Sequence, residues 1–204
     1  MSISFLNLMH ACFPNISPES TADLYQLVRQ KHLYKNWLFS TQDSDILFQG
    51  DIVKSLPVLI ALDRGKALKK ELPALLLNNT CDLQVDNEKP RCEHVSFIPL
   101  LPFSEYISAF QNISNHERDA RENVITHKFY ISIPPNEERD YIADLGLISS
   151  VNSGFFHQEL KKGGIKKVCS LSINGYYYFL AKLTLHLMRR EPLQVKRQEL
   201  IKES

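Results

Sequence analysis

Short apolar runs, each ended by turn residues, are the feature that most constrains how this chain folds. Short runs bounded by Gly, Pro, Asn or Asp are typical of β-strands joined by tight turns. A run with no polar residue in it is typical of a strand buried on both faces. The runs that predict strands are Ile46–Phe48, Ile52–Val53, Leu56–Leu62, Pro73–Leu77, Val95–Leu101, Phe129–Ile133 and Tyr141–Val151.

A helix is predicted near the start of the chain. Ser17, Pro18 and Glu19 supply an N-cap, a proline in the first helical position and an acidic first turn. The helix runs from about residue 18 to 33, and its apolar face carries Leu24, Leu27 and Val28, with Leu33 at its end. The first 43 residues are therefore predicted to form a helical extension.

A second helix is predicted near the end, because Ser172 is a good N-cap ahead of a run with helical spacing. Pro192 ends that helix, so residues 191–204 form a basic tail. A helical insertion is predicted near 104–126, and His116–Glu122 within it is expected to be a solvated charged segment. The apolar face predicted for the last helix consists of Tyr176, Phe179, Leu180, Leu183 and Leu187.

Composition excludes several classes of protein. The chain has 204 residues, 44% of them hydrophobic, with 24 Lys and Arg against 23 Asp and Glu, so a nucleic acid could be bound only through a local basic patch. Four cysteines are too few for a disulfide scaffold, which indicates a reducing cytoplasm. No apolar run approaches the roughly 20 residues that span a bilayer. We expect a cytoplasmic protein with no membrane contact and no cofactor.

The order of the segments resembles the PemK/MazF family. The matching segments are GDIV at 50–53, LPALLL at 72–77, VSFIPL at 95–100, YIADLGLISSV at 141–151 and the capped terminal helix. The resemblance implies a mainly β fold with added helices (α+β): a small SH3-like barrel spanning residues 44–190. It also implies a prokaryotic toxin–antitoxin or defence setting.

The residues that the family uses to cleave RNA are not matched. The family has an arginine before the proline of the buried strand, where this chain has Leu72, and a threonine after the proline of the next strand, where it has Leu100 and Leu101. Leucine can neither stabilise a developing phosphorane charge nor transfer a proton. A displaced Arg64, Lys69 or Lys70 is the remaining route to an active endoribonuclease.

A polar run directly after the buried strand is the candidate ligand site. It consists of Asn78–Asp82, and the residues proposed to line a pocket are Asp51, Asn79, Thr80, Cys81 and Asp82. The alternative is a turn whose side chains bond to nearby backbone. Cys81, Cys92 and His94 lack the short paired spacing of a structural zinc site, so we expect no metal.

Four lysines around a Gly-Gly turn are the candidate nucleic-acid site. They are Lys161, Lys162, Lys166 and Lys167, placed by the sequence in a hairpin between two strands. The alternative is a solvated hairpin whose charges prevent edge aggregation. The resulting hypothesis is a non-catalytic binding module for a protein partner or for RNA or DNA, with a homodimer left open. The competing hypotheses are an active endoribonuclease and a structural subunit that docks a larger assembly.

Overall fold

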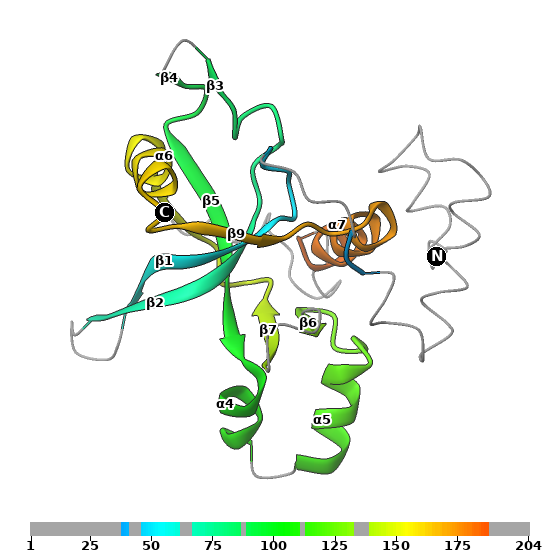
Figure 1. Ribbon diagram of the computed structural model, residues 1–204. Helices are drawn as coiled ribbons and strands as arrows, with labels where there is room; N and C mark the ends of the chain where they lie inside the picture. Colours follow the sequence, from blue (N-terminus) through cyan, green and yellow to red (C-terminus); the bar gives the residue numbers. More distant parts are fainter. Residues whose placement is uncertain are drawn as a thin grey trace, which may run out of the picture.

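The computed structural model describes residues 38–40, 46–61, 67–86, 89–110, 113–132 and 139–187. The helix predicted over 18–33, the tail 191–204 and Arg64 lie outside these ranges. Within them the chain forms a seven-stranded antiparallel sheet with four helices, consistent with a small barrel-like fold (Figure 1). The predicted α+β class is confirmed. No helix in the described part is long and apolar enough to cross a bilayer.

Two long strands form the centre of the sheet. β1 (Ile52–Ala61) and β2 (Ala67–Leu76) are antiparallel, and Leu56 lies opposite Leu72. Proline at position 57 is tolerated in β1 because the edge strand β9 (Lys166–Cys169) pairs only with residues 52–54 of that strand. A bulge between Val53 and Leu56 holds Ser55 at a positive φ of 64° and bends β1.

The remaining strands extend the sheet from β2, in the order β6-β7-β5-β2-β1-β9. β5 (His94–Pro102) pairs with β2 through residues 97–99. On its other side β5 pairs first with β8 (Ser149–Asn152) and then with β7 (Asp140–Asp144). β6 (Lys128–Ser132) pairs with β7, and β3 (Val85–Asp86) and β4 (Lys89–Pro90) form a separate small hairpin.

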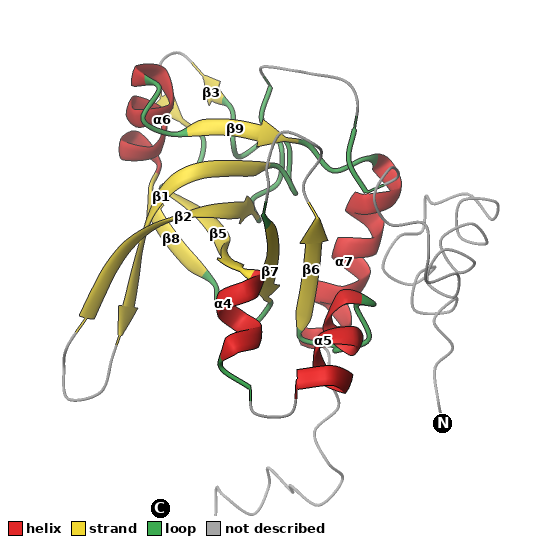
Figure 2. Ribbon diagram, turned by 60° about the horizontal axis from the view of Figure 1, so that its bottom comes forward, coloured by secondary structure: helices red, strands yellow, loops and turns green. Residues whose placement is uncertain are grey.

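Side chains alternate between two cores because the central strands are buried on both faces. Val53, Leu76 and Phe97 point towards α6 (Ser153–Lys162), whose Phe156 is fully buried among them. Ile52, Leu75 and Ile98 point to the opposite core, where they meet Phe129 and the last helix. The helices therefore cover different faces of one twisted sheet (Figure 2).

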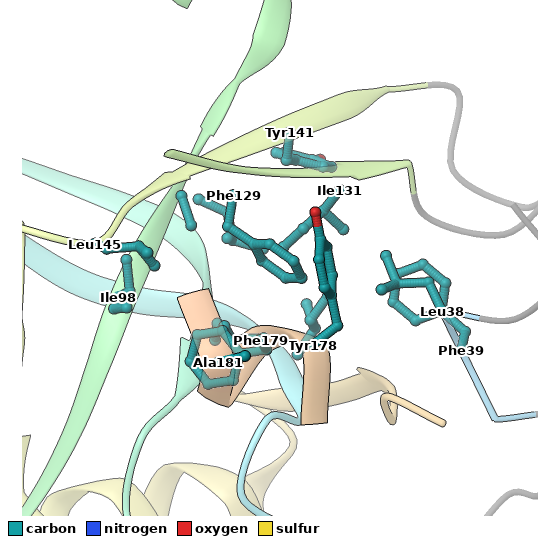
Figure 3. Packing of buried hydrophobic residues seen from close by; sticks show 14 residues of the cluster. Leu38, Phe39, Ile98, Phe129, Ile131, Tyr141, Leu145, Tyr178, Phe179 and Ala181 are labelled. Carbon is teal, nitrogen blue, oxygen red and sulfur yellow. The ribbon is translucent and has the colours of Figure 1, made fainter. Parts of the chain in front are cut away.

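The last helix, α7 (Ile173–Leu187), begins as predicted, since the Ser172 hydroxyl accepts a hydrogen bond of 3.0 Å from the Gly175 amide. Its buried face differs from the predicted one. Tyr178, Phe179, Ala181 and Lys182 are buried, whereas Leu187 is 63% exposed. Figure 3 shows Tyr178 between Phe129 and the segment Leu38–Phe39, with Phe179 beside Ala181.

The predicted helical insertion consists of α4 (Phe103–Ser108) and α5 (Ile113–Arg121). The expectation of a solvated segment at 116–122 is wrong in one respect, because α5 buries Ala120 against Phe103 and Ile142. A single small residue on a charged helix gives no apolar periodicity, so the sequence pattern did not reveal this contact. The insertion covers the outer face of β6 and β7.

Candidate nucleic-acid interface

The candidate ligand site after β2 forms a compact turn. The Asn79 carbonyl oxygen accepts hydrogen bonds from the amides of Asp82 and Leu83, at 2.9 and 3.2 Å. The Thr80 hydroxyl oxygen accepts from the Gln49 amide at 3.2 Å, which ties the turn to the segment before β1. Cys81 is exposed. These contacts match the alternative of a turn stabilised by local hydrogen bonds, and a ligand role for the four residues stays a prediction.

Asp51 is the buried member of the candidate site, with a side chain that is 1% exposed. Its Oδ2 accepts a hydrogen bond from the Phe48 amide at 2.9 Å and lies 2.9 Å from the Lys167 ammonium. Its Oδ1 is also buried and has no hydrogen-bond partner. Asp51 therefore fixes the entry into β1, and it is separated from solvent by Lys167.

Lys167 is held by residues that precede β1. Besides Asp51, it donates to the Ile46 carbonyl oxygen at 2.7 Å and lies 5.1 Å from the centre of the Phe48 ring. Its neighbour Lys166 is exposed and belongs to the opposite face of β9, because successive strand residues alternate. The contacts of Lys167 bury it in an ion pair, while Lys166 is available to a partner in solution.

Three of the predicted lysines flank one turn, although not in a hairpin between strands. Lys161 and Lys162 are the last residues of α6, and Gly163 ends that helix in the left-handed conformation. The Lys166 side chain folds back so that its Cε lies 3.8 Å from where a Cβ on Gly163 would be. The Lys162 ammonium lies 3.3 Å from Glu159 Oε1. The end of α6 and the start of β9 thus place these cations together.

A fourth cation, which sequence reasoning missed, completes the group. Lys54 lies directly opposite Lys166 in the β1–β9 register. We refer to Lys54, Lys161, Lys162 and Lys166 as the lysine surface. Lysines in the last turn of a helix are favourable on their own, but like charges directly opposite each other on neighbouring strands are unfavourable. The β1–β9 pairing therefore places two lysines opposite each other at the edge of the sheet.

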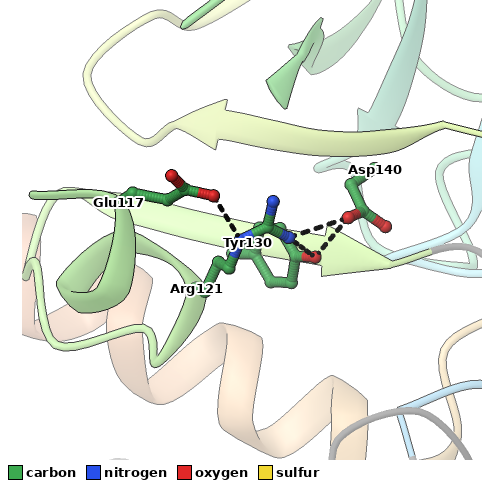
Figure 4. Close-up of polar contacts among 4 residues, drawn as sticks. All are labelled: Glu117, Arg121, Tyr130 and Asp140. Carbon is green, nitrogen blue, oxygen red and sulfur yellow. Dashed lines mark hydrogen bonds and ion pairs between the residues drawn. The ribbon is translucent and has the colours of Figure 1, made fainter. Parts of the chain in front are cut away.

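An arginine on the helical insertion is engaged by carboxylates. Arg121 lies 2.9 Å from both Glu117 and Asp140, and it donates to the Tyr130 hydroxyl at 2.8 Å (Figure 4). Burial, with hydrogen bonding to Asp140, raises the pKa of Tyr130 to about 12. The phenol stays protonated at neutral pH and cannot act as a base. The network holds α5 on β6 and β7.

Lys182 is the buried cation of the apolar core. Its ammonium donates to the carbonyl oxygens of Asn123 and Ile125, at 2.6 and 3.0 Å, and thereby binds the turn after α5 to α7. Burial lowers the pKa of Lys182 to about 7. A lysine among the apolar residues of a helix does not by itself predict a buried cation, because its long side chain usually extends the charged end to solvent.

The lowered pKa of Lys182 predicts a pH dependence of stability. Between about pH 7 and the unfolded value near 10.4, the unfolded chain binds more protons than the folded one, so this group makes the fold more stable as the pH rises. The loss of unfolding free energy caused by Lys182→Met should therefore be about 1.5 kcal/mol larger at pH 8.5 than at pH 7. Urea unfolding of both proteins at the two pH values measures this, and an equal cost at both would contradict it.

Comparisons with known proteins give a distant structural likeness. The chain matches no known sequence family and no curated protein. A solved structure described as "Crystal structure of MazE-MazF (Form-II) from Deinococcus radiodurans" contains a chain that is similar to this one at 10% identity. The match covers 72% of this chain and 100% of that chain, with a TM-score of 0.37. So distant a likeness carries no argument about function.

Proposed function

We propose that this protein is a non-catalytic binding module that contacts the phosphates of a nucleic acid through the lysine surface. The observation that carries the proposal is the direct cross-strand pairing of Lys54 with Lys166. Lys161 and Lys162 at the end of α6 are also exposed, and Lys162 forms a surface ion pair with Glu159. Contacts of this kind supply most of the sequence-independent affinity for nucleic acids.

The net charge makes a local surface necessary. With a formal net charge of +1, the molecule as a whole does not attract a polyanion, so binding depends on where its cations gather. Lys167 lies outside the surface because Asp51 neutralises it. The proposal therefore names four specific lysines rather than a general basic character.

The residues that stand where the PemK/MazF family has its RNA-cleaving side chains support the non-catalytic part of the proposal. Leu72 is 3% exposed and Leu100 is fully buried, so neither reaches a substrate. Lys70 is paired with Glu105 at 3.2 Å. Arg121 is bound to two carboxylates, which leaves it poorly placed to stabilise a further negative charge. A toxin–antitoxin or defence setting stays an expectation from the sequence resemblance.

The test is the affinity of the full chain for a fluorescent 20-nucleotide RNA, measured by anisotropy. Lys161→Glu/Lys162→Glu/Lys166→Glu is expected to weaken binding at least tenfold, and to reduce the slope of log affinity against log salt by about two to three. The reason is that each substitution removes one phosphate contact, together with the counterion release that accompanies that contact.

The matched control changes the net charge equally at exposed cations elsewhere. Lys69→Glu/Arg118→Glu/Arg139→Glu should keep affinity within about threefold of the wild type. Equal weakening by both triple variants would mean that binding follows overall charge, and would contradict a localised surface. No RNA or DNA binding by the wild type at low salt would reject the proposed function itself.

A further inference from the structure

α7 has almost no charge to present to solvent. Across Ile173–Leu187 the sole Lys or Arg residue is Lys182, which is buried, and there is no Asp or Glu. A helix that lies on a surface normally carries charged residues on its outer side, whereas one that is apolar all round is normally buried. Tyr178, Phe179 and Ala181 are buried in the core, and Tyr177, Leu180 and Leu183 are partly buried against it.

The other side of α7 exposes large apolar residues at both ends. Ile173 is 65% exposed and Leu187 is 63% exposed. Tyr177 and Leu180 lie between them at spacings of four and three residues, and both are half-buried. Because residues three and four apart share a helix face, these side chains form a continuous apolar stripe. We call Ile173, Tyr177, Leu180 and Leu187 the α7 stripe.

The segment before the sheet is anchored at the start of α7. The Ser172 amide donates to the Leu38 carbonyl oxygen, and the Ser40 amide donates to that of Ser170, each at 2.9 Å. Phe39 forms an antiparallel bridge with Leu171 between these two bonds. Leu38 and Phe39 are 3% and 6% exposed in the same core as Tyr178. Chain that precedes Leu38 must therefore start beside the first turn of α7.

We propose that residues 18–33 dock as an amphipathic helix on the α7 stripe of the same molecule. Only residues 34–37 separate that segment from the anchor at Leu38, and five peptide links reach at most about 17 Å. The predicted helix would be about 24 Å long and α7 is about 22 Å long, so the two match in length. Leu24, Leu27 and Val28 supply the complementary apolar face.

The test is hydrogen exchange of the full chain, followed by mass spectrometry at concentrations where light scattering shows a monomer. Amides of residues 18–33 should exchange at least tenfold more slowly than in an unstructured peptide of that sequence. Leu24→Glu/Leu27→Glu should remove this protection. Gln26→Glu/Gln30→Glu introduces the same charges on the polar side of the predicted helix and should keep it.

A variant of α7 tests the other partner in the contact. Ile173→Glu/Leu187→Glu alters two exposed residues, so amides of β2 and β5 should stay protected while residues 18–33 lose protection. Exchange of the wild-type segment at the unstructured rate would overturn the proposal. So would protection that rises with protein concentration together with a dimer, since a second copy would then cover the stripe. Unchanged protection in the α7 variant would place the segment elsewhere and equally overturn it.

Discussion

Gly175→Ala is expected to lower the free energy of unfolding by about 3 kcal/mol or more. An alanine inside a helix ordinarily stabilises it by about 1 kcal/mol relative to glycine. Here the added Cβ would overlap the carbonyl oxygen of Leu38 and lie 3.0 Å from its carbonyl carbon. Both groups are backbone, so no side chain can rotate away, and the anchored segment 38–40 must separate from α7.

Urea unfolding measures this change, and limited proteolysis after Leu38 reports whether the segment is released. Gly154→Ala in α6 is the matched helical control, since its Cβ would meet a side chain and no backbone: the Asn152 Oδ1 that caps the Phe155 amide, at 3.1 Å. That variant should lower the free energy of unfolding by no more than the roughly 1 kcal/mol that a weakened cap costs. A Gly175→Ala protein as stable as the wild type would show that Leu38 does not lie against α7.

Asp51→Asn should also destabilise the fold strongly, and we expect it to lower the free energy of unfolding by about 3 kcal/mol. Asparagine has the same shape and can still accept from the Phe48 amide, but it leaves the Lys167 ammonium without its counter-charge. Lys167 is only 15% exposed, so water compensates poorly. Asp119→Asn removes a carboxylate from an exposed ion pair with Arg118 and should cost less than about 1 kcal/mol.

A double-mutant cycle separates the loss of the ion pair from a general effect on folding. Asp51→Asn combined with Lys167→Met should cost at least about 1 kcal/mol less than the sum of the two single variants. Additive costs would mean that the two groups do not interact. The same result would remove the reason for excluding Lys167 from the lysine surface.

The strands that could be predicted from the sequence are those in which burial leaves a clear pattern. Pro73–Leu77 lies largely within β2, and the turn Asn78–Asp82 follows where the apolar run ends. The cap at Ser172 could also be predicted, because a capping hydroxyl acts within one turn of its helix. Local chemistry fixes these features.

Features that depend on strand register could not be predicted. Lys54 and Lys166 are more than a hundred residues apart in the sequence and meet because β9 pairs with the start of β1. The same pairing brings Lys167 to Asp51 and removes it from the predicted surface. For α7, the predicted face was displaced by about one residue because nearly every position is apolar, so periodicity could not select the buried side.

A protein that binds nucleic acid without cleaving it should leave bound RNA intact. End-labelled RNA is held with saturating protein and a metal chelator for several hours, recovered from the complex and separated on a denaturing gel. The recovered RNA is expected to be full length. Discrete fragments that appear with wild-type protein, persist through extensive purification and disappear with Arg121→Ala would contradict it.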